Sequence, residues 1–208
     1  MRLLTAVEAR VLGVLVEKQA TVPDTYPLSL NALVAGCNQK TARDPVMTAS
    51  DADVLTAIDG LKSLSLVFEG SGSRVVKFEH NTARVLGLPS QSVALLATLM
   101  LRGPQTAAEL RLNCERLHRF ADISSVEGFL DELAAKEPPR VAKLARAPGS
   151  REPRWAQLLC GDAPSPSAQA EVATPSLFEQ LEARVATLEA QVAALLQRAG
   201  DSASGGAE

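Results

Sequence analysis

The sequence has little of what metalloproteins, secreted proteins and membrane proteins need. Its 208 residues include only two histidines and three cysteines, and none lies at the spacing of a metal site or a disulfide framework. No apolar run approaches the roughly 18 uncharged residues of a membrane span. Glu8, Arg10 and Glu17 interrupt the N-terminal apolar stretch, where a secretory signal would need an unbroken core. We therefore expect a cytoplasmic protein that has no membrane segment and binds no metal or cofactor.

Catalytic motifs are missing as well. The chain has no GxSxG nucleophile elbow, no Gly-rich phosphate loop and no HExxH zinc motif. Its acidic residues Glu8, Asp24 and Asp44 are not spaced as a catalytic pair. The sequence therefore predicts a protein that is not an enzyme.

Charge is balanced in most of the chain and acidic at its end. Residues 1–88 carry nine basic and nine acidic side chains, residues 89–162 carry ten and nine, and residues 163–208 carry two and six. Dedicated nucleic-acid-binding modules usually have a basic excess. Any contact with DNA would therefore have to come from local basic patches.

Helical spacing of apolar residues predicts three helices in the first part of the chain. Thr5 and a glutamate three residues later form a capping-box pattern for a helix that ends near Gln19. A second helix is expected over residues 30–37, and Ser50 or Asp51 should cap a third. The apolar stripe of the third helix is expected to consist of Val54, Leu55, Ile58, Leu61 and Leu64.

A β-hairpin is predicted next, and the same order of elements then recurs. Apolar runs at residues 66–68 and 75–78 flank a Gly-rich turn, which is typical of a hairpin. In the second copy, helices are expected to begin at Ser90 or Ser92, at Thr106, and at Ser124 or Ser125, followed by hairpin strands at residues 141–144 and 155–158.

The recurrence predicts a duplicated fold. Matching apolar positions of the three helices are 84, 77 and 72 residues apart, so the second copy has the shorter loops. Three helices followed by a hairpin is the winged-helix order. The expected class is α+β and mostly helical, with two tandem winged-helix domains at residues 1–83 and 88–160 and a short coiled-coil helix after them.

The C-terminal part has the composition of a linker, a coiled coil and a tail. Residues 161–175 are rich in Pro, Ser and Ala. Residues 176–199 alternate apolar positions at spacings of three and four, as a parallel homodimeric coiled coil would, although an amphipathic helix packed on its own chain fits the same pattern. Residues 200–208 are expected to be disordered. The proposed dimer seam consists of Phe178, Leu181, Val185, Leu188, Val192 and Leu195.

A long and compositionally unusual segment, Cys37-Asn-Gln-Lys-Thr-Ala-Arg-Asp-Pro-Val-Met47, carries a resemblance to a known family. There and in the residues before it, the chain closely resembles the bacterial YceH family, and the likeness extends to about Cys160. The resemblance implies tandem winged helices. It supplies no substrate, because that family has no assigned biochemical role.

Two functions remain open from the sequence. The expected third helices carry several carboxylates, including Asp51, Asp53 and Asp131, which would repel DNA phosphates. DNA contact would therefore fall to wings and loops, through Lys40, Arg43, Arg74, Lys77, Arg146, Arg151 and Arg154. The polar loop of Asn38, Gln39, Lys40, Arg43, Asp44 and Pro45 is either a rigid support for the third helix or a binding surface. The fold favours a DNA-binding regulator, and the alternative is an adaptor that docks a protein partner.

Overall fold

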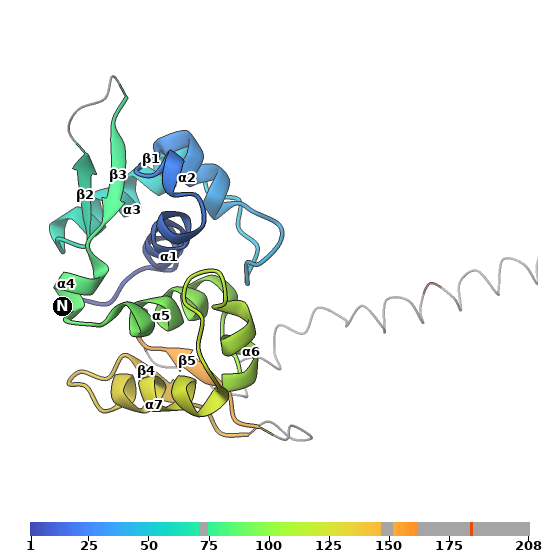
Figure 1. Ribbon diagram of the computed structural model, residues 1–208. Helices are drawn as coiled ribbons and strands as arrows, with labels where there is room; N and C mark the ends of the chain where they lie inside the picture. The colour runs from blue at the N-terminus through green and yellow to red at the C-terminus, as the bar shows by residue number, and fades with distance from the viewer. Residues whose placement is uncertain (71–74, 147–151, 162–183, 185–208) are drawn as a thin grey trace, which may run out of the picture. The chain divides into compact units, whose positions relative to one another are not determined.

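The elements of the chain follow the order expected from hydrophobic spacing. The computed structural model describes residues 1–70, 75–146, 152–161 and Arg184, and over these residues it has seven α-helices and two small antiparallel sheets. The α+β class is therefore confirmed, with helices as the dominant element (Figure 1). Three helices and a hairpin occur first between residues 6 and 80, and again between residues 90 and 157.

Local capping fixes the helices of the first half. Thr5 and Glu8 form a capping box at the start of the first helix, and Ser50 and Asp53 form another at the third. The predicted starts are confirmed, and the first helix continues to Thr21, two residues past the predicted end. The elements are α1 (Ala6–Thr21), the 3-10 turn η1 (Pro23–Thr25), β1 (Leu28–Ser29), α2 (Leu30–Cys37), α3 (Asp51–Ser63), β2 (Val67–Gly70) and β3 (Lys77–His80).

The second half repeats this order after a short connecting helix. Thr106 caps its second helix as predicted. The predicted cap of its third helix at Ser124 or Ser125 is wrong, because the Asp122 carboxylate accepts from the Ser125 amide at 2.7 Å and starts the helix earlier. The elements are α4 (Thr82–Leu86), α5 (Ser90–Arg102), α6 (Ala107–Asn113), α7 (Ile123–Ala134), β4 (Val141–Lys143) and β5 (Trp155–Gln157).

The two sheets are small and antiparallel. In the first, β3 lies between β1 and β2, with Leu28 opposite Phe78. The second consists of β4 and β5. The strand predicted at residues 75–78 begins only at Lys77, because Val75 and Val76 lie before the ladder, where they are 58% and 54% exposed.

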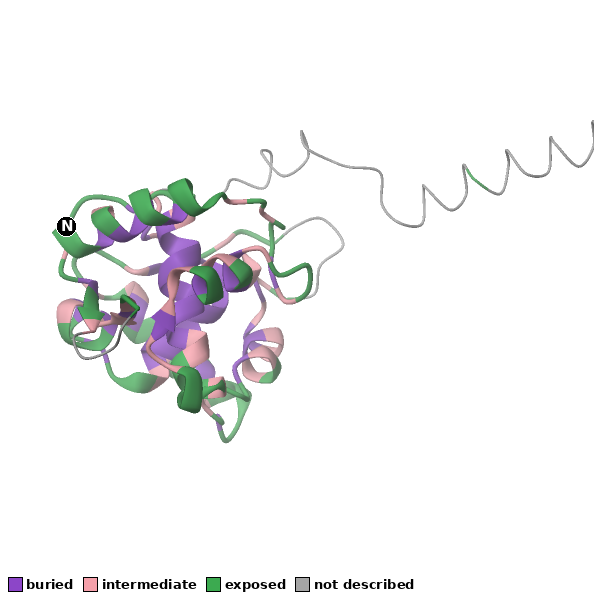
Figure 2. Cartoon of the chain, turned by 90° about the horizontal axis from the view of Figure 1, so that it is seen from above, coloured by how far each residue is buried: buried purple, intermediate pink, exposed green. Residues whose placement is uncertain are grey.

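Helices α1 and α5 lie side by side at the centre of the fold (Figure 1). Residues 8–16 of α1 and 92–101 of α5 are buried throughout, which is typical of helices enclosed on all sides. Gly13 allows the close approach, since a Cβ there would lie 3.0 Å from the Leu101 side chain. Buried residues gather at the centre and exposed ones at the periphery (Figure 2).

The two halves share one core. Their buried apolar residues form one cluster, and residues 1–165 make up one of the two units into which the chain divides, the other being residues 166–208. The boundaries predicted for two separate domains therefore stay a prediction. In the second unit the structure describes Arg184, which is helical and exposed. Within the described residues, every helix falls short of the length and apolar content needed to cross a bilayer.

Candidate functional site

An apolar groove lies between α2, α3 and the β2–β3 hairpin. Its volume is about 750 Å³, within the range of pockets that bind ligands or side chains. Leu55 of α3 lines it, together with Val75 and Val76 in front of β3. The remaining lining residues are Ser29, Leu30, Asn31, Glu69, Lys77 and Phe78.

The position of Leu55 corrects the predicted core. Leu55 is 42% exposed, whereas Val54 and Ile58 on the same helix are buried. Val54, Ile58 and Leu61 are spaced four and three residues apart and already form a complete inward stripe, so Leu55, about 100° round the helix from Val54, faces the groove. Phe68 on β2 is also exposed, at 44%.

Carboxylates flank the apolar groove. Asp51 and Asp59 lie four residues before and after Leu55 on α3, and both are exposed. Residues four apart are neighbours on a helix surface, so Leu55 sits between two acidic side chains. Glu69 lines the groove from β2 and forms an ion pair with Lys62. Lys77, opposite Gly70 on the neighbouring strand β3, also lines the groove and is half-buried.

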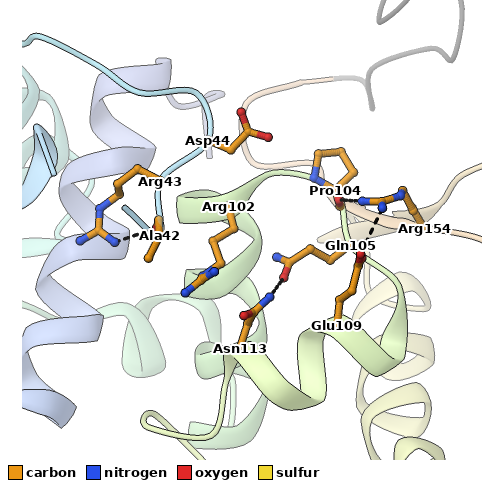
Figure 3. Close-up of a pocket in the computed structure, with 9 residues that line it drawn as sticks. All are labelled: Ala42, Arg43, Asp44, Arg102, Pro104, Gln105, Glu109, Asn113 and Arg154. Atoms are coloured by element: carbon orange, nitrogen blue, oxygen red, sulfur yellow. Dashed lines mark hydrogen bonds and ion pairs between the residues drawn. The ribbon is translucent and has the colours of Figure 1, made fainter. Parts of the chain in front are cut away.

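The cations predicted to contact DNA are not equivalent. Lys40 and Arg146 are exposed. Arg154 is exposed too, but its guanidinium donates to the Pro104 carbonyl at 2.7 Å and pairs with Glu109 at 3.1 Å (Figure 3). Arg74 and Arg151 lie outside the described residues, as do the seam residues Phe178, Leu181, Val185, Leu188, Val192 and Leu195.

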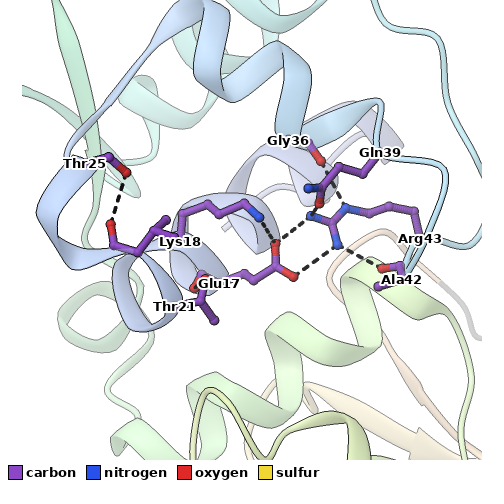
Figure 4. A network of polar contacts seen from close by, with 9 residues as sticks. Glu17, Lys18, Thr21, Thr25, Gly36, Gln39, Ala42 and Arg43 are labelled. Atoms are coloured by element: carbon purple, nitrogen blue, oxygen red, sulfur yellow. Dashed lines mark hydrogen bonds and ion pairs between the residues drawn. The ribbon is translucent and has the colours of Figure 1, made fainter.

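Arg43 differs most from its prediction. Its side chain has no exposed area, and its five N–H donors are all used. It donates to Glu17 at 2.6 and 3.2 Å, to the Gln39 amide oxygen at 2.6 Å, and to the carbonyls of Gly36 and Ala42 (Figure 4). A guanidinium engaged in this way has no donor left for a phosphate, so we assign Arg43 to the architecture of the loop.

The ion pair between Arg43 and Glu17 also sets the charge state of the Glu17 carboxyl group. Burial raises the pKa of Glu17, but the hydrogen bonds and charge of Arg43 outweigh it, so that the pKa lies below its ordinary value. Glu17 also contacts Lys18 at 3.2 Å. The carboxylate is therefore charged at neutral pH and holds the loop against α1.

The rest of the polar loop ties helices together. The Asn38 side chain donates to the Ala49 carbonyl and accepts from the Ala49 amide, both at 2.8 Å, just before α3. The amide of Asp44 donates to the Leu101 carbonyl of α5 at 2.8 Å. Buried Arg10 of α1 donates to the Cys37 and Pro45 carbonyls at 3.0 and 2.6 Å. These contacts favour a rigid support for α3.

Comparison with known proteins identifies the family. Residues 4–150 match the family model "Protein of unknown function, DUF480". The chain belongs to this family. A UPF0502 protein of Leptothrix cholodnii is 79% identical over 159 residues, which cover 76% of this chain and 72% of that protein. UPF0502 proteins of Burkholderia pseudomallei and Paraburkholderia xenovorans are 68% and 66% identical over 200 residues, which cover 94% of this chain and 86% and 85% of theirs.

Membership of DUF480 confirms the sequence-based recognition of an uncharacterised bacterial family. The family match includes the polar loop, the groove and most of the second half. It names no activity, so the function has to be inferred from the surfaces of this chain.

Proposed function

We propose that this DUF480 protein is an adaptor whose groove beside α3 docks a short, apolar segment of a protein partner that carries basic flanking residues. We also infer that each half is a winged-helix unit, since each has three helices followed by a hairpin that would serve as the wing. In this proposal the first unit presents its third helix and wing to a protein.

The clustering of exposed apolar side chains is the observation that carries the proposal. A single exposed leucine or valine is ordinary on a protein surface. Leu55, Val75 and Val76 instead line one groove of about 750 Å³, and contiguous apolar surface of this kind marks interaction sites. The partner segment would bury two or three apolar side chains there.

The charge around the groove selects the flanks of the partner. Asp51 and Asp59 on either side of Leu55 are exposed, and Glu69 adds a third carboxylate, paired with Lys62. Lysine or arginine next to the apolar anchors would meet the two aspartates, whereas acidic flanks would be repelled. Such rim charges mainly affect the association rate and its salt dependence.

Duplex DNA binding is the second candidate, supported by the exposure of Lys40 and Arg146. It has less support than docking, because Arg43 is buried and Arg154 is paired. Helix α7 also exposes Glu127, Asp131 and Glu132, which repel phosphates as the aspartates of α3 do. Binding through the remaining cations would be weak, with a log–log salt slope of about −0.9 per neutralised phosphate.

A selection from a random peptide library on the full chain tests the proposal. We expect enriched peptides to have two or three apolar residues at helical spacing with lysine or arginine beside them, and to lose binding to a Leu55→Glu protein. Fluorescence anisotropy with a labelled duplex, run in parallel at low salt, should show weak binding or none. Acidic or patternless selected peptides, together with tight duplex binding, would refute docking in favour of the DNA-binding function.

A further inference from the structure

A second, polar pocket lies where the two halves meet. It has a volume of about 300 Å³ and is lined from the first half by residues 42–44 of the polar loop (Figure 3). The second half contributes Arg102 at the end of α5, Gln105, Glu109 and Asn113 around α6, and Arg154 in front of β5. The pocket is separate from the apolar groove and shares no residue with it.

Most polar groups of this junction pocket are already engaged. Arg43 is saturated by Glu17, Gln39 and backbone carbonyls, and Arg154 is held by Glu109 and the Pro104 carbonyl. The Asn113 amide donates to the Gln105 oxygen at 2.6 Å. Buried Gln105 in turn donates to the Thr98 and Gly103 carbonyls at 3.4 and 3.3 Å. The wall around α6 is thus fixed by its own hydrogen bonds.

Two lining side chains are the exceptions, since among the described residues neither the Arg102 guanidinium nor the Asp44 carboxylate has a hydrogen-bond or ion-pair partner. Arg102 is half-buried. Figure 3 shows it pointing toward Asn113, whereas the Asp44 carboxylate points away from it. A guanidinium offers five donors in a planar fork that matches an oxyanion, so Arg102 can serve as the anion-binding side chain of the pocket.

A neighbouring pocket adds a second cation. This smaller pocket, of about 110 Å³, also contains Arg102 and Asn113 and is lined by exposed Arg116. The Glu17 carboxylate, which also lines this smaller pocket, forms ion pairs with Arg43 and Lys18. The two pockets share Ala42, Arg102 and Asn113. Among the described residues neither Arg102 nor Arg116 has an ion-pair partner, so both positive charges are available to an anion.

We propose that the junction pocket binds a small oxyanion, a phosphate- or carboxylate-bearing metabolite, with Arg102 as its bidentate donor and Arg116 as a supporting charge. Bidentate arginine–oxyanion pairs are among the stronger hydrogen-bonded contacts in proteins. Because the anion would bind the folded chain, linking α5 to the segment after α6, it would raise the thermal stability of the protein.

Calorimetric titration and thermal unfolding of the full chain test this site, with inorganic phosphate and malonate as separate probes and sodium chloride at equal ionic strength as reference. We expect saturable binding of at least one probe. At about 100 times its Kd, Tm should rise by roughly 5–10 °C. The better probe distinguishes a phosphate ligand from a carboxylate ligand.

Variants localise the effect. Arg102→Gln should weaken binding at least about tenfold, and Arg116→Gln should weaken it less. Arg84→Gln is the matched control, since Arg84 is exposed on α4 and lines neither pocket. Arg102→Lys keeps the charge but not the fork, so it should retain part of the affinity and provides a folded variant if Arg102→Gln is unstable.

Three results would overturn the proposal. One is that neither probe raises Tm above the chloride reference. Another is that Arg102→Gln binds as tightly as the wild type. The third is that Arg84→Gln loses as much affinity as Arg102→Gln, because binding would then reflect general surface charge.

Discussion

Replacing Arg43 by methionine should cost far more stability than replacing any exposed arginine of this chain. The change removes five hydrogen bonds and leaves Glu17, whose side chain is 17% exposed, without its main partner. Breaking a buried ion pair from one side costs about 3–5 kcal/mol. For a chain of this size that corresponds to a fall in Tm of roughly 6–20 °C.

The loss should depend on pH in a defined direction. With Arg43 present, the lowered pKa of Glu17 gives stability that is complete above the unfolded pKa, roughly 4.3, and is lost as pH falls through the folded value. In Arg43→Met, burial raises the pKa of Glu17 and only Lys18 opposes it, so the pKa should lie above its value in the wild type. The variant should therefore gain less stability than the wild type does as pH rises through about 4.3. The gap between the two proteins should therefore widen from pH 4 to pH 7.

Urea unfolding of wild type, Arg43→Met, Glu17→Gln and the double variant measures this coupling directly. The double variant should be more stable than the sum of the single losses predicts, because it leaves no unpaired buried charge. Arg154→Met is the control, since that arginine and Glu109 are 47% and 43% exposed and such pairs contribute about 0–1 kcal/mol. Equal losses for Arg43→Met and Arg154→Met, or a gap that does not change with pH, would refute the assignment of Arg43 to the loop architecture.

Three further predictions concern other parts of the chain. Gly36→Ala should destabilise the folded chain by about 1–3 kcal/mol, because the new Cβ would lie 2.6 Å from Val14 Cγ1. Gly128→Ala on helix α7 should stabilise it by about 0.5–1 kcal/mol, because no atom lies within 4 Å of the new Cβ. If urea unfolding gave the reverse order, the packing described for these helices would be contradicted. Partial burial lowers the pKa of His80 to about 4. Between about pH 4 and 6.5 the unfolded imidazole therefore binds a proton that the folded one does not, and stability rises with pH. Urea unfolding of His80→Gln should show a weaker dependence on pH over this interval, and an unchanged slope would be inconsistent with a neutral imidazole in the folded chain. If residues 176–199 pair as a coiled coil, light scattering should give the mass of a dimer, and the chain cut at Gly161 should give the mass of a monomer. The same number of chains per particle before and after truncation would exclude that role of the seam.

The features that sequence predicted well are local. The caps at Thr5, Ser50 and Thr106 depend on a side chain and a backbone amide three residues apart, so the pattern itself contains both partners. Helical spacing likewise located all three helices of each half. The short helix α4 and the two-residue strand β1 were missed because elements of this length have no measurable periodicity.

The features that sequence missed depend on distant partners. An arginine in a polar loop is expected to be exposed, and the ion pair of buried Arg43 depends on Glu17, which lies 26 residues earlier on α1. Leu55 is apolar and was therefore expected in the core. Val54, Ile58 and Leu61 form the buried face of the helix instead, and Leu55 faces the groove. Arg102 looks like an ordinary helix C-terminal cation, and its place in a pocket follows from the packing of α5 against the polar loop.

The most direct test of protein docking is the affinity of an amphipathic leucine–lysine peptide for the full chain and two leucine variants. Leu55→Glu places a charge in the groove, while Leu112→Glu places one on α6, where the leucine is 68% exposed and outside the groove. We predict by fluorescence anisotropy that the first variant binds at least about tenfold more weakly than wild type and that the second binds as wild type does. Equal affinity of all three proteins, or no binding by wild type at low salt, would contradict the proposed docking function.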